Sequence, residues 1–208
     1  MVRYTVAILA SAIPAYILGG VNGAIITSRI FFRKDIREYG SGNPGLTNFY
    51  RVFGKSGSLM VIAIDVFKTV APVLFGGWLF GRFLDMSFLG RAISGVFVIL
   101  GHCFPVFYKF KGGKGVMAAG AIVIFLDWRM AIISWGTFLL LTALTRYVSL
   151  GAMLGGATFP LTLVLFRIGG VWELVAVSMC SVLLIVRHEA NIRRLIRGEE
   201  SKFRIRKE

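Results

Sequence analysis

The sequence predicts an all-α, polytopic membrane protein, and three observations carry that prediction. Hydrophobic residues make up 56% of the 208 residues and charged residues only 16%, which is too apolar a balance for a soluble domain. Apolar runs near the length of about 20 residues that crosses a bilayer recur along the whole chain. The net charge is +14, and most basic residues lie close to these runs. Anionic lipid headgroups are therefore the expected counter-charge, and no nucleic acid is expected as a partner.

Five apolar runs are each expected to form one helix that crosses the membrane. They cover residues 4–27, 59–81, 92–110, 150–166 and 171–186. The first run is too long for a signal-peptide core and lacks a small-residue cleavage site, so we expect it to remain as a span. Cys103 and Cys180 fall inside such runs and are predicted to be small core residues, without a disulfide or a thiolate metal site.

Residues 116–144 form a sixth apolar run, which fits either one long tilted helix or two short helices that turn at Asp127-Trp128-Arg129. Two helices give seven spans, and the segments that then share one face hold 18 of the 24 Lys and Arg residues. These segments are residues 29–58, 109–115, 145–149 and 187–208. Basic residues concentrate in cytoplasmic loops. We therefore expect seven transmembrane helices in a single domain over residues 1–208, with the N-terminus outside and the C-terminus cytoplasmic.

The first basic segment contains a loop rich in small and polar residues, Ser41-Gly42-Asn43-Pro44-Gly45-Leu46-Thr47-Asn48. Asn43 precedes a proline, as a helix N-cap often does, which predicts a short helix over residues 44–53. Asn48 and Arg51 are predicted to share a polar face of that helix. The Ser41 hydroxyl, the loop amides and Arg51 would then meet at the helix start, where an anion is favoured. The alternative is an interfacial elbow whose glycines and proline only shape a turn.

The second basic segment is a lysine-bearing loop with paired glycines, Lys109-Phe110-Lys111-Gly112-Gly113-Lys114-Gly115. Successive glycines allow the backbone amides to point toward one anion as a nest, and Lys114 adds a full positive charge. The loop is not a nucleotide-binding Walker A motif, because Tyr108 and Gly115 occupy positions where that motif needs Gly and Ser or Thr. The alternative is an anchor of positive charge beside the membrane with flexible glycines.

Two further sets of polar residues lie at or inside the spans. His188 and Asn191, just after the last run, are expected to share a helix face and to bind hydroxyl and phosphate oxygens; the alternative is that they cap the last span. Asp65 and Lys68 are predicted to form a structural ion pair near the site, with substrate contact as the alternative. His102 is expected to be hydrogen-bonded inside the bundle. Residues 199–208 form a charged tail to which the sequence assigns no role.

In their order along the chain, these motifs resemble the bacterial acyl-phosphate-dependent glycerol-3-phosphate acyltransferase family. The resemblance rests on the loop from Ser41 to Asn48 with Arg51, the stretch from Gly101 to Gly115, and His188-x-x-Asn191 followed by Arg194 and Leu195. Each motif alone is weakly specific, but the three in this order are highly specific. The resemblance covers essentially the whole chain, including the plan of seven spans.

The resemblance implies an enzyme of the bacterial cytoplasmic (inner) membrane that transfers a fatty acyl group from acyl phosphate to the 1-hydroxyl of sn-glycerol 3-phosphate. The products are lysophosphatidic acid and phosphate, in the first step of phospholipid synthesis. Membrane lipid and the enzyme that produces acyl phosphate are the other implied partners, and no cofactor or metal ion is expected. The implied catalytic residues are Lys114, His188 and Ser41, and the implied substrate-binding residues are Asn43, Thr47, Asn48, Arg51, Gly112, Gly113, Gly115, Ser149 and Asn191.

An acyl phosphate is already activated, so positioning and charge stabilisation are expected to supply most of the acceleration without a covalent enzyme intermediate. No Asp stands five residues after either histidine, which excludes the His-x4-Asp arrangement of other glycerolipid acyltransferases. The base is therefore His188 or a substrate phosphate, and we favour the phosphate, with His188 as a binding and orienting residue. Competing classes are an anion transporter, which usually shows an inverted repeat, and a lipid-binding scaffold, which leaves Ser41 and Asn191 unexplained.

Overall fold

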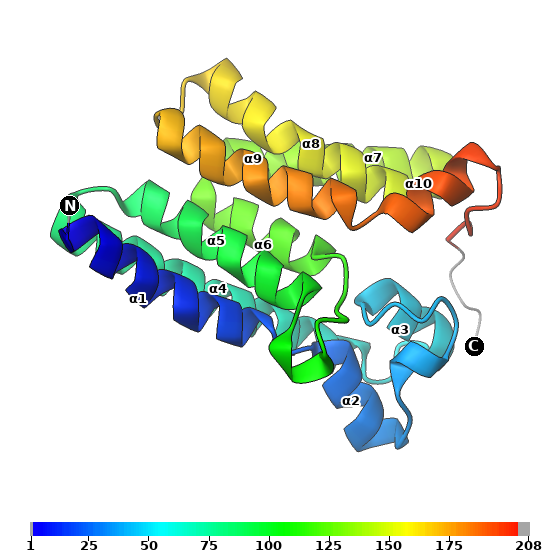
Figure 1. Ribbon diagram of the computed structural model, residues 1–208. Coiled ribbons are helices and arrows are strands. Elements are labelled where there is room, and N and C mark those ends of the chain that lie inside the picture. Colours follow the sequence, from blue (N-terminus) through cyan, green and yellow to red (C-terminus); the bar gives the residue numbers. More distant parts are fainter. Residues whose placement is uncertain (1, 204–208) are drawn as a thin grey trace.

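The structure is a computed structural model that describes residues 2–203, and over this range its regular elements are all helical (Figure 1). Residues 204–208, the end of the charged tail, lie outside the described residues. The α-helices are α1 (Val2–Gly19), α2 (Gly23–Phe32), α3 (Leu46–Phe53), α4 (Ser58–Leu84), α5 (Ser87–Cys103), α6 (Val116–Leu126), α7 (Trp128–Thr145), α8 (Val148–Phe166), α9 (Val171–Val186) and α10 (Glu189–Ile196). Two short 3-10 helices are η1 (Ile36–Glu38) and η2 (Val106–Tyr108).

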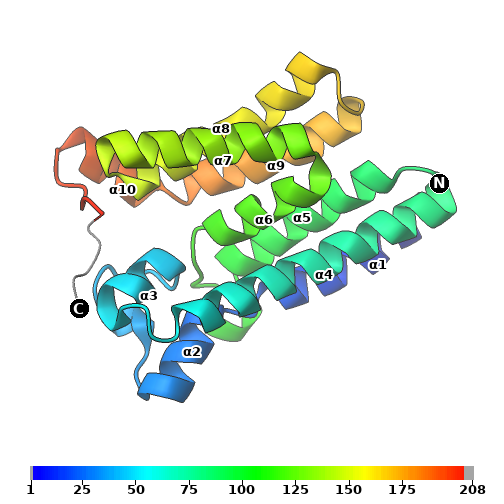
Figure 2. The ribbon, with the colours of Figure 1, turned by 180° about the vertical axis from the view of Figure 1, so that it is seen from behind.

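The long helices form one bundle in which α5 is the central element. It packs against α1 and α4 on one side and against α6 and α9 on the other, while α7 and α8 pack together and complete the outer layer. Both ribbon views place α2, α3 and α10 at one end of this bundle and the start of α1 at the opposite end (Figures 1 and 2). The short helices and the basic loops of the chain therefore gather at one end.

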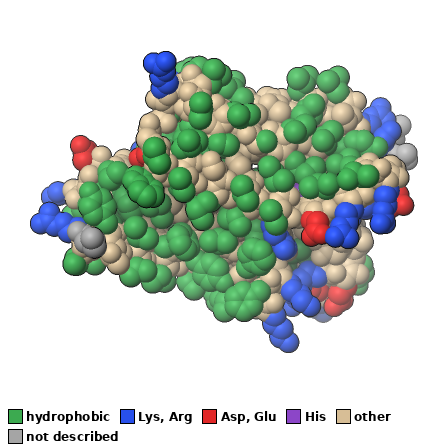
Figure 3. Space-filling view, turned by 45° about the horizontal axis from the view of Figure 1, so that its top comes forward, with side chains coloured by type: hydrophobic (Ala, Val, Ile, Leu, Met, Phe, Trp, Pro, Cys, Tyr) green, Lys and Arg blue, Asp and Glu red, His purple; other side chains and the backbone are tan. Residues whose placement is uncertain are grey.

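Several helices have the length and the apolar surface of membrane spans. Among the described residues, five helical segments are long and apolar enough to cross a membrane, or six if the bent pair of α9 and α10 counts as one span. Seven full-length spans are not established by these lengths, because α6 has only 11 residues, a rise of about 16 Å. Figure 3 shows hydrophobic side chains over much of one face, with Lys and Arg side chains mainly toward its ends.

The predicted turn within residues 116–144 is confirmed, since the chain breaks between α6 and α7 at Asp127. Asp127 is the N-cap of α7, and its side chain accepts a hydrogen bond from the N–H of Arg129. Two other runs differ in detail from their prediction. The first run lies within one candidate span, Val2–Phe32, but its helix is interrupted before Gly23, where Asn22 caps α2 by accepting from the N–H of Ile25. The third run stops at Cys103, since Pro105 disfavours helical geometry in the residue before it.

Small residues allow the central helices to pack closely. A Cβ atom on Gly19 of α1 would lie 2.4 Å from the carbonyl oxygen of Val98 in α5, so only glycine fits at this crossing. Cys103 and Cys180 are buried as predicted and have no disulfide. The predicted ion pair is confirmed as well: Asp65 Oδ1 and Lys68 Nζ lie 2.8 Å apart, and both side chains are buried.

Candidate active site

A cavity of about 710 Å³ opens at the end of the bundle where α3 and α10 lie. All three sequence motifs contribute to its wall, although they are far apart along the chain. The polar residues that line it include Ser41, Asn43, Thr47, Asn48, Arg51, Lys114, Ser149, His188, Asn191, Arg194 and Glu200. Of the residues predicted to bind substrate, only Gly112 and Gly113 do not line it.

Three helices begin at this cavity. The first residues of α3, α6 and α8 are among those that line it: Leu46 and Thr47, Val116 and Met117, and Val148 and Ser149. None of these three N-termini has a side-chain cap. First-turn N–H groups lack a partner within their own helix and carry partial positive charge, so they remain available to an anionic ligand. The sequence predicted an anion at the start of only the first of these three helices.

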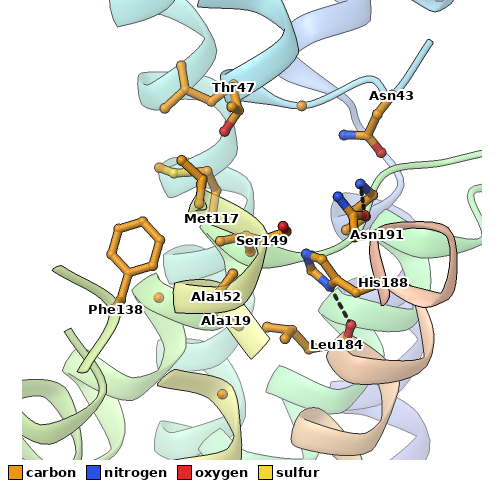
Figure 4. A pocket seen from close by; sticks show the side chains of 18 of the residues that line it. Asn43, Thr47, Met117, Ala119, Phe138, Ser149, Ala152, Leu184, His188 and Asn191 are labelled. Atoms are coloured by element: carbon orange, nitrogen blue, oxygen red, sulfur yellow. Dashed lines mark hydrogen bonds between the residues drawn. The ribbon is translucent and has the colours of Figure 1, made fainter. Parts of the chain in front are cut away.

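The first loop differs from its prediction at Asn43, which is not a helix N-cap. The short helix α3 begins at Leu46, and Gly45 is its N-cap. The chain before it is held in a tight turn, because the N–H of Gly45 donates to the carbonyl of Asn43 at 2.9 Å. The carbonyl of Pro44 also accepts from the side chain of Asn22 at 3.1 Å, which ties the loop to α2. The side chain of Asn43 therefore reaches the cavity instead of capping the helix (Figure 4).

Asn48 and Arg51 of α3 both line the cavity, but they differ in exposure and in their contacts. Asn48 is buried, and its carboxamide accepts from the N–H of Ser41 at 2.9 Å and donates to the carbonyl of Tyr39 at 3.0 Å. It therefore fixes the position of Ser41 beside the cavity. Arg51 is exposed on the next turn and lines the cavity mouth, where its charge is available to an anion.

The loop over residues 109–115, called the glycine loop below, supports the site, and its Gly112 and Gly113 lie outside the cavity wall. The N–H groups of Gly112 and Gly113 donate to the carbonyls of Cys103 and His102, at 3.2 Å and 3.1 Å, so they do not point together as an anion nest. The guanidinium of Arg187 donates to the carbonyls of the same two glycines, at 3.2 and 3.3 Å. This double attachment places Lys114, the next residue, in the cavity wall.

Lys114 reaches across the cavity to the last motif. Its Nζ donates to Asn191 Oδ1, 77 positions away in the sequence. Burial lowers the pKa of Lys114 to about 8, and the nearby positive charge of Arg194 acts in the same direction. Lys114 therefore remains mostly protonated at neutral pH but loses its charge at only mildly alkaline pH.

His188 is buried, and its ring lies at the end of α9. Nδ1 lies 2.8 Å from the carbonyl oxygen of Leu184, which can only accept, so Nδ1 carries the proton and Nε2 has a free lone pair. This contact is the capping bond that the sequence left open as an alternative. Burial lowers the pKa of His188 to about 4, so the ring is neutral at pH 7. In Figure 4, His188 lies on the same side of the pocket as Asn191 and faces Ser149.

Glu200 is the functional-site residue that sequence reasoning missed. It belongs to the charged tail, yet its carboxylate accepts from Ser149 at 2.5 Å, Asn191 at 2.6 Å and Arg194 at 2.7 Å. Burial raises the pKa of Glu200, but these hydrogen bonds outweigh that effect and lower it overall. The tail is also fixed through the backbone, because the N–H of Phe203 donates to the carbonyl of Arg146 at 2.8 Å. No spacing in the sequence singles out this glutamate among the charges of the tail.

The other part of the cavity is apolar. Figure 4 shows Phe138 on the side opposite His188, with Ala152 and Met117 between them. This apolar part is lined by Met117, Ala119, Gly120, Trp135, Phe138, Ala152, Gly155, Gly156, Phe159 and Leu184. The indole of Trp135 is fixed by a 3.1 Å hydrogen bond from Nε1 to the carbonyl of Gly120. A cationic end and an apolar end in one cavity match a ligand that carries both an anionic group and a hydrocarbon chain.

The fold and this cavity define a helical membrane protein whose cavity has one cationic end and one apolar end. Comparison with known proteins names the class more closely. A family model described as glycerol-3-phosphate acyltransferase matches residues 9–198, and the chain belongs to this family. The glycerol-3-phosphate acyltransferase of Photobacterium profundum is 38% identical over 201 residues, which are 94% of this chain and 93% of that protein. That of Staphylococcus aureus is 33% identical over 201 residues, which are 95% of this chain and 98% of the relative.

A solved structure has the same fold. The crystal structure of PlsY, an integral membrane glycerol 3-phosphate acyltransferase, in its glycerol 3-phosphate form, is 32% identical and superposes with a TM-score of 0.83. The match covers 95% of this chain and 96% of that one. The lysophosphatidic acid form of PlsY superposes with a TM-score of 0.81. This chain is therefore an integral membrane protein of the glycerol-3-phosphate acyltransferase family.

Proposed function

We propose that this protein transfers a fatty acyl group from acyl phosphate to the 1-hydroxyl of sn-glycerol 3-phosphate, giving lysophosphatidic acid and phosphate. The observation that carries this proposal is the cavity itself, in which three helix N-termini and Lys114 face an apolar groove. An acyl phosphate has that shape, with a phosphate at one end and a hydrocarbon chain at the other. The glycerol 3-phosphate and lysophosphatidic acid forms of the related PlsY support the acceptor and the product.

The reaction needs no covalent intermediate on the enzyme. The 1-hydroxyl oxygen attacks the acyl carbonyl carbon, the carbon–oxygen bond to phosphate breaks, and the leaving phosphate takes up the electron pair. Lys114 and the uncapped start of α6 stabilise the charge that develops on this phosphate. Ser41, Arg51 and Asn191 hold the phosphate and glycerol of the acceptor, with Asn43, Thr47 and Ser149 lining the same space.

His188 is proposed to orient glycerol 3-phosphate by accepting from its 2-hydroxyl, and a substrate phosphate is proposed to take the proton of the attacking 1-hydroxyl. The free Nε2 lone pair of His188 can accept a hydrogen bond from a hydroxyl group. Its pKa of about 4 makes the ring a weak base. A phosphate group, whose second pKa is about 6, is a stronger base than the His188 ring and therefore the better proton acceptor in this site.

We also propose that the whole chain acts as a single unit with seven passes of the cytoplasmic membrane, its N-terminus outside and its active site on the cytoplasmic face. The opposite positions of the start of α1 and α10 support an odd number of passes (Figure 1). The orientation is supported by the sequence, in which segments 29–58, 109–115, 145–149 and 187–208 hold 18 of the 24 Lys and Arg residues. On this plan α6 is a short pass whose N-terminus remains within the cavity.

The direct test gives purified protein acyl phosphate and glycerol 3-phosphate and measures lysophosphatidic acid and free phosphate. We expect the two products in equal amounts, and no product when acyl-CoA replaces acyl phosphate. A transporter or a lipid-binding scaffold would form neither product. Formation of lysophosphatidic acid from acyl-CoA alone, without acyl phosphate, contradicts the proposed donor.

A further inference from the structure

Three charged or polar side chains lie buried beneath the cavity, in a cluster that the proposed reaction does not use. They are Asp65 and Lys68 of α4 and His102 of α5, with 1%, 2% and 4% of their surface exposed. Charges inside a membrane bundle are costly, so they are usually paired and serve a function. Asp65 and His102 also contribute to the cavity wall, which connects the cluster to the site.

Lys68 is the centre of the cluster. Its ammonium group lies within bonding distance of three acceptors: Asp65 Oδ1 at 2.8 Å, the carbonyl of Val21 at 2.5 Å, and His102 Nδ1 at 2.9 Å. An ammonium group has three N–H donors and no acceptor. All three donors are therefore used, and His102 Nδ1 must accept. The proton of the neutral ring is then on Nε2, so Lys68 fixes both the orientation and the tautomer of His102.

The ring and the backbone of His102 both meet the glycine loop. The carbonyl of His102 accepts from the N–H of Gly113 at 3.1 Å. A Cβ atom on Gly113 would lie 2.3 Å from His102 Nε2, so the imidazole edge is pressed against this glycine. A rotated ring would collide with the loop or would leave it unsupported. Gly113 is followed by Lys114 and then by the start of α6, the groups that face the leaving phosphate.

We propose that Asp65 and Lys68 are positioning residues for the donor half of the reaction, which they influence through His102. Asp65 fixes the position of Lys68, and Lys68 fixes the ring of His102. His102 in turn contacts Gly113. These contacts keep Lys114 and the N-terminus of α6 at the positions where they can bind the phosphate of the acyl donor. This inference rests on the proposed function and extends it to residues outside the set proposed to bind the substrates. The attachment of Asp65 to the N–H of Gly23 at 3.1 Å anchors the other end of the chain of contacts in α2.

The first test replaces Lys68 while avoiding a lone buried charge. Removal of one partner of a buried ion pair is strongly destabilising, whereas removal of both is often tolerated. The double variant Asp65→Asn with Lys68→Met is therefore measured beside Lys68→Met alone. We expect KM for acyl phosphate to rise about tenfold or more, and KM for glycerol 3-phosphate to stay within about threefold of wild type. Thr69→Val is the matched control, because Thr69 is buried next to Lys68 and its hydroxyl bonds to the carbonyl of Asp65 in its own helix.

The second test separates the role of His102 as a hydrogen-bond acceptor for Lys68 from the volume that its side chain fills. His102→Asn retains an acceptor near the position of Nδ1, whereas His102→Leu fills similar space without one. We expect the Asn variant to bind acyl phosphate at least about threefold more tightly than the Leu variant, with both measured well below their melting temperatures. Thermal stabilisation by a non-hydrolysable acyl phosphonate gives the same order without turnover.

These outcomes separate the two proposals. Wild-type protein that forms no lysophosphatidic acid refutes the proposed function. Wild-type turnover combined with an unchanged donor KM in the double variant refutes the positioning role alone. The positioning role is also refuted if both KM values increase equally, because a purely structural cluster would not favour one substrate. It is refuted as well if His102→Asn and His102→Leu bind the donor equally, because a purely structural role would not require a hydrogen-bond acceptor at this position.

Discussion

Lys114 Nζ lies 2.5 Å from Asn191 Oδ1, so the glycine loop and the helix that follows the last long helix meet directly across the cavity. The same Asn191 donates through Nδ2 to Glu200 at 2.6 Å. A single asparagine thus links the main cation of the site to its carboxylate. A phosphate that enters the site competes for these partners, because it offers Lys114 a stronger, charged acceptor than an amide.

The lowered pKa of Lys114 predicts an alkaline limit to donor binding. The pKa is about 8 in the free protein, so the ammonium form is nearly complete at pH 7 and falls as the pH rises through 8. If only the charged form binds, KM for acyl phosphate should rise about tenfold per pH unit well above the pKa. Lys114→Arg keeps its charge over this range, so its KM should stay flat even if it is higher throughout. An identical alkaline rise in both proteins would assign the titration to another group.

His188 is predicted to affect the acceptor more than the chemical step. In His188→Ala the hydroxyl of glycerol 3-phosphate that donates to Nε2 loses its hydrogen-bond partner. A buried donor or acceptor left unpaired costs about 1–3 kcal/mol. We therefore expect KM for glycerol 3-phosphate to rise about tenfold or more, with kcat at saturating acceptor within about threefold of wild type.

The pH profile of kcat provides the control for this prediction. Because the ring is already neutral at pH 7, with a pKa of about 4, any inflection near about pH 6 belongs to the substrate phosphate and should persist in His188→Ala. A large fall in kcat at saturating glycerol 3-phosphate, together with loss of a pH dependence present in the wild type, would make His188 the base.

Features with a cause close by in the sequence could be predicted. The helix break at Asp127 was predicted because two helices within residues 116–144 place 18 of the 24 Lys and Arg residues on one face, and the structure adds that Asp127 is the N-cap of α7. Asp65 and Lys68 were paired correctly because their spacing places them on one helix face at a depth where charge must be matched. Local spacing and burial cost are properties of the sequence itself.

The features that the sequence could not predict depend on tertiary contacts. The N–H groups of Gly112 and Gly113 are used by the end of α5, a partner that no spacing within the loop specifies. Asn43 fails to cap because Asn22, from a different helix, holds Pro44 in place. Glu200 reaches the cavity only because residues 199–203 lie against the start of α8, so its contacts depend on long-range packing rather than on a local motif.

Glu200 is predicted to stabilise the folded protein through its contacts with Ser149, Asn191 and Arg194. Glu200→Gln removes the charge that pairs with Arg194, and we expect a lower melting temperature, with a loss in stability of about 1–3 kcal/mol. Glu199→Gln is the matched control, because its side chain is exposed one position earlier. The folded-state pKa of Glu200 is lowered, so its contribution is present at neutral pH and is lost as the pH falls through that pKa. The gap between wild type and Glu200→Gln should therefore close in acid; a gap that persists there would point to packing rather than charge.

The apolar half of the cavity predicts a chain-length effect at Ala152. This residue lies on α8 between His188 and Phe138 in Figure 4 and is 5% exposed, so a larger side chain there projects into the groove. Each buried methylene contributes about 0.8 kcal/mol, and displacement of two of them weakens a long-chain donor by about tenfold. Ala152→Phe should therefore raise KM for a long-chain acyl phosphate by about tenfold or more and leave butyryl phosphate nearly unaffected. Leu154→Phe, at an exposed position of the same helix, is the control. Equal losses with both donors would mean that the acyl chain does not pass Ala152 and that the groove serves another purpose.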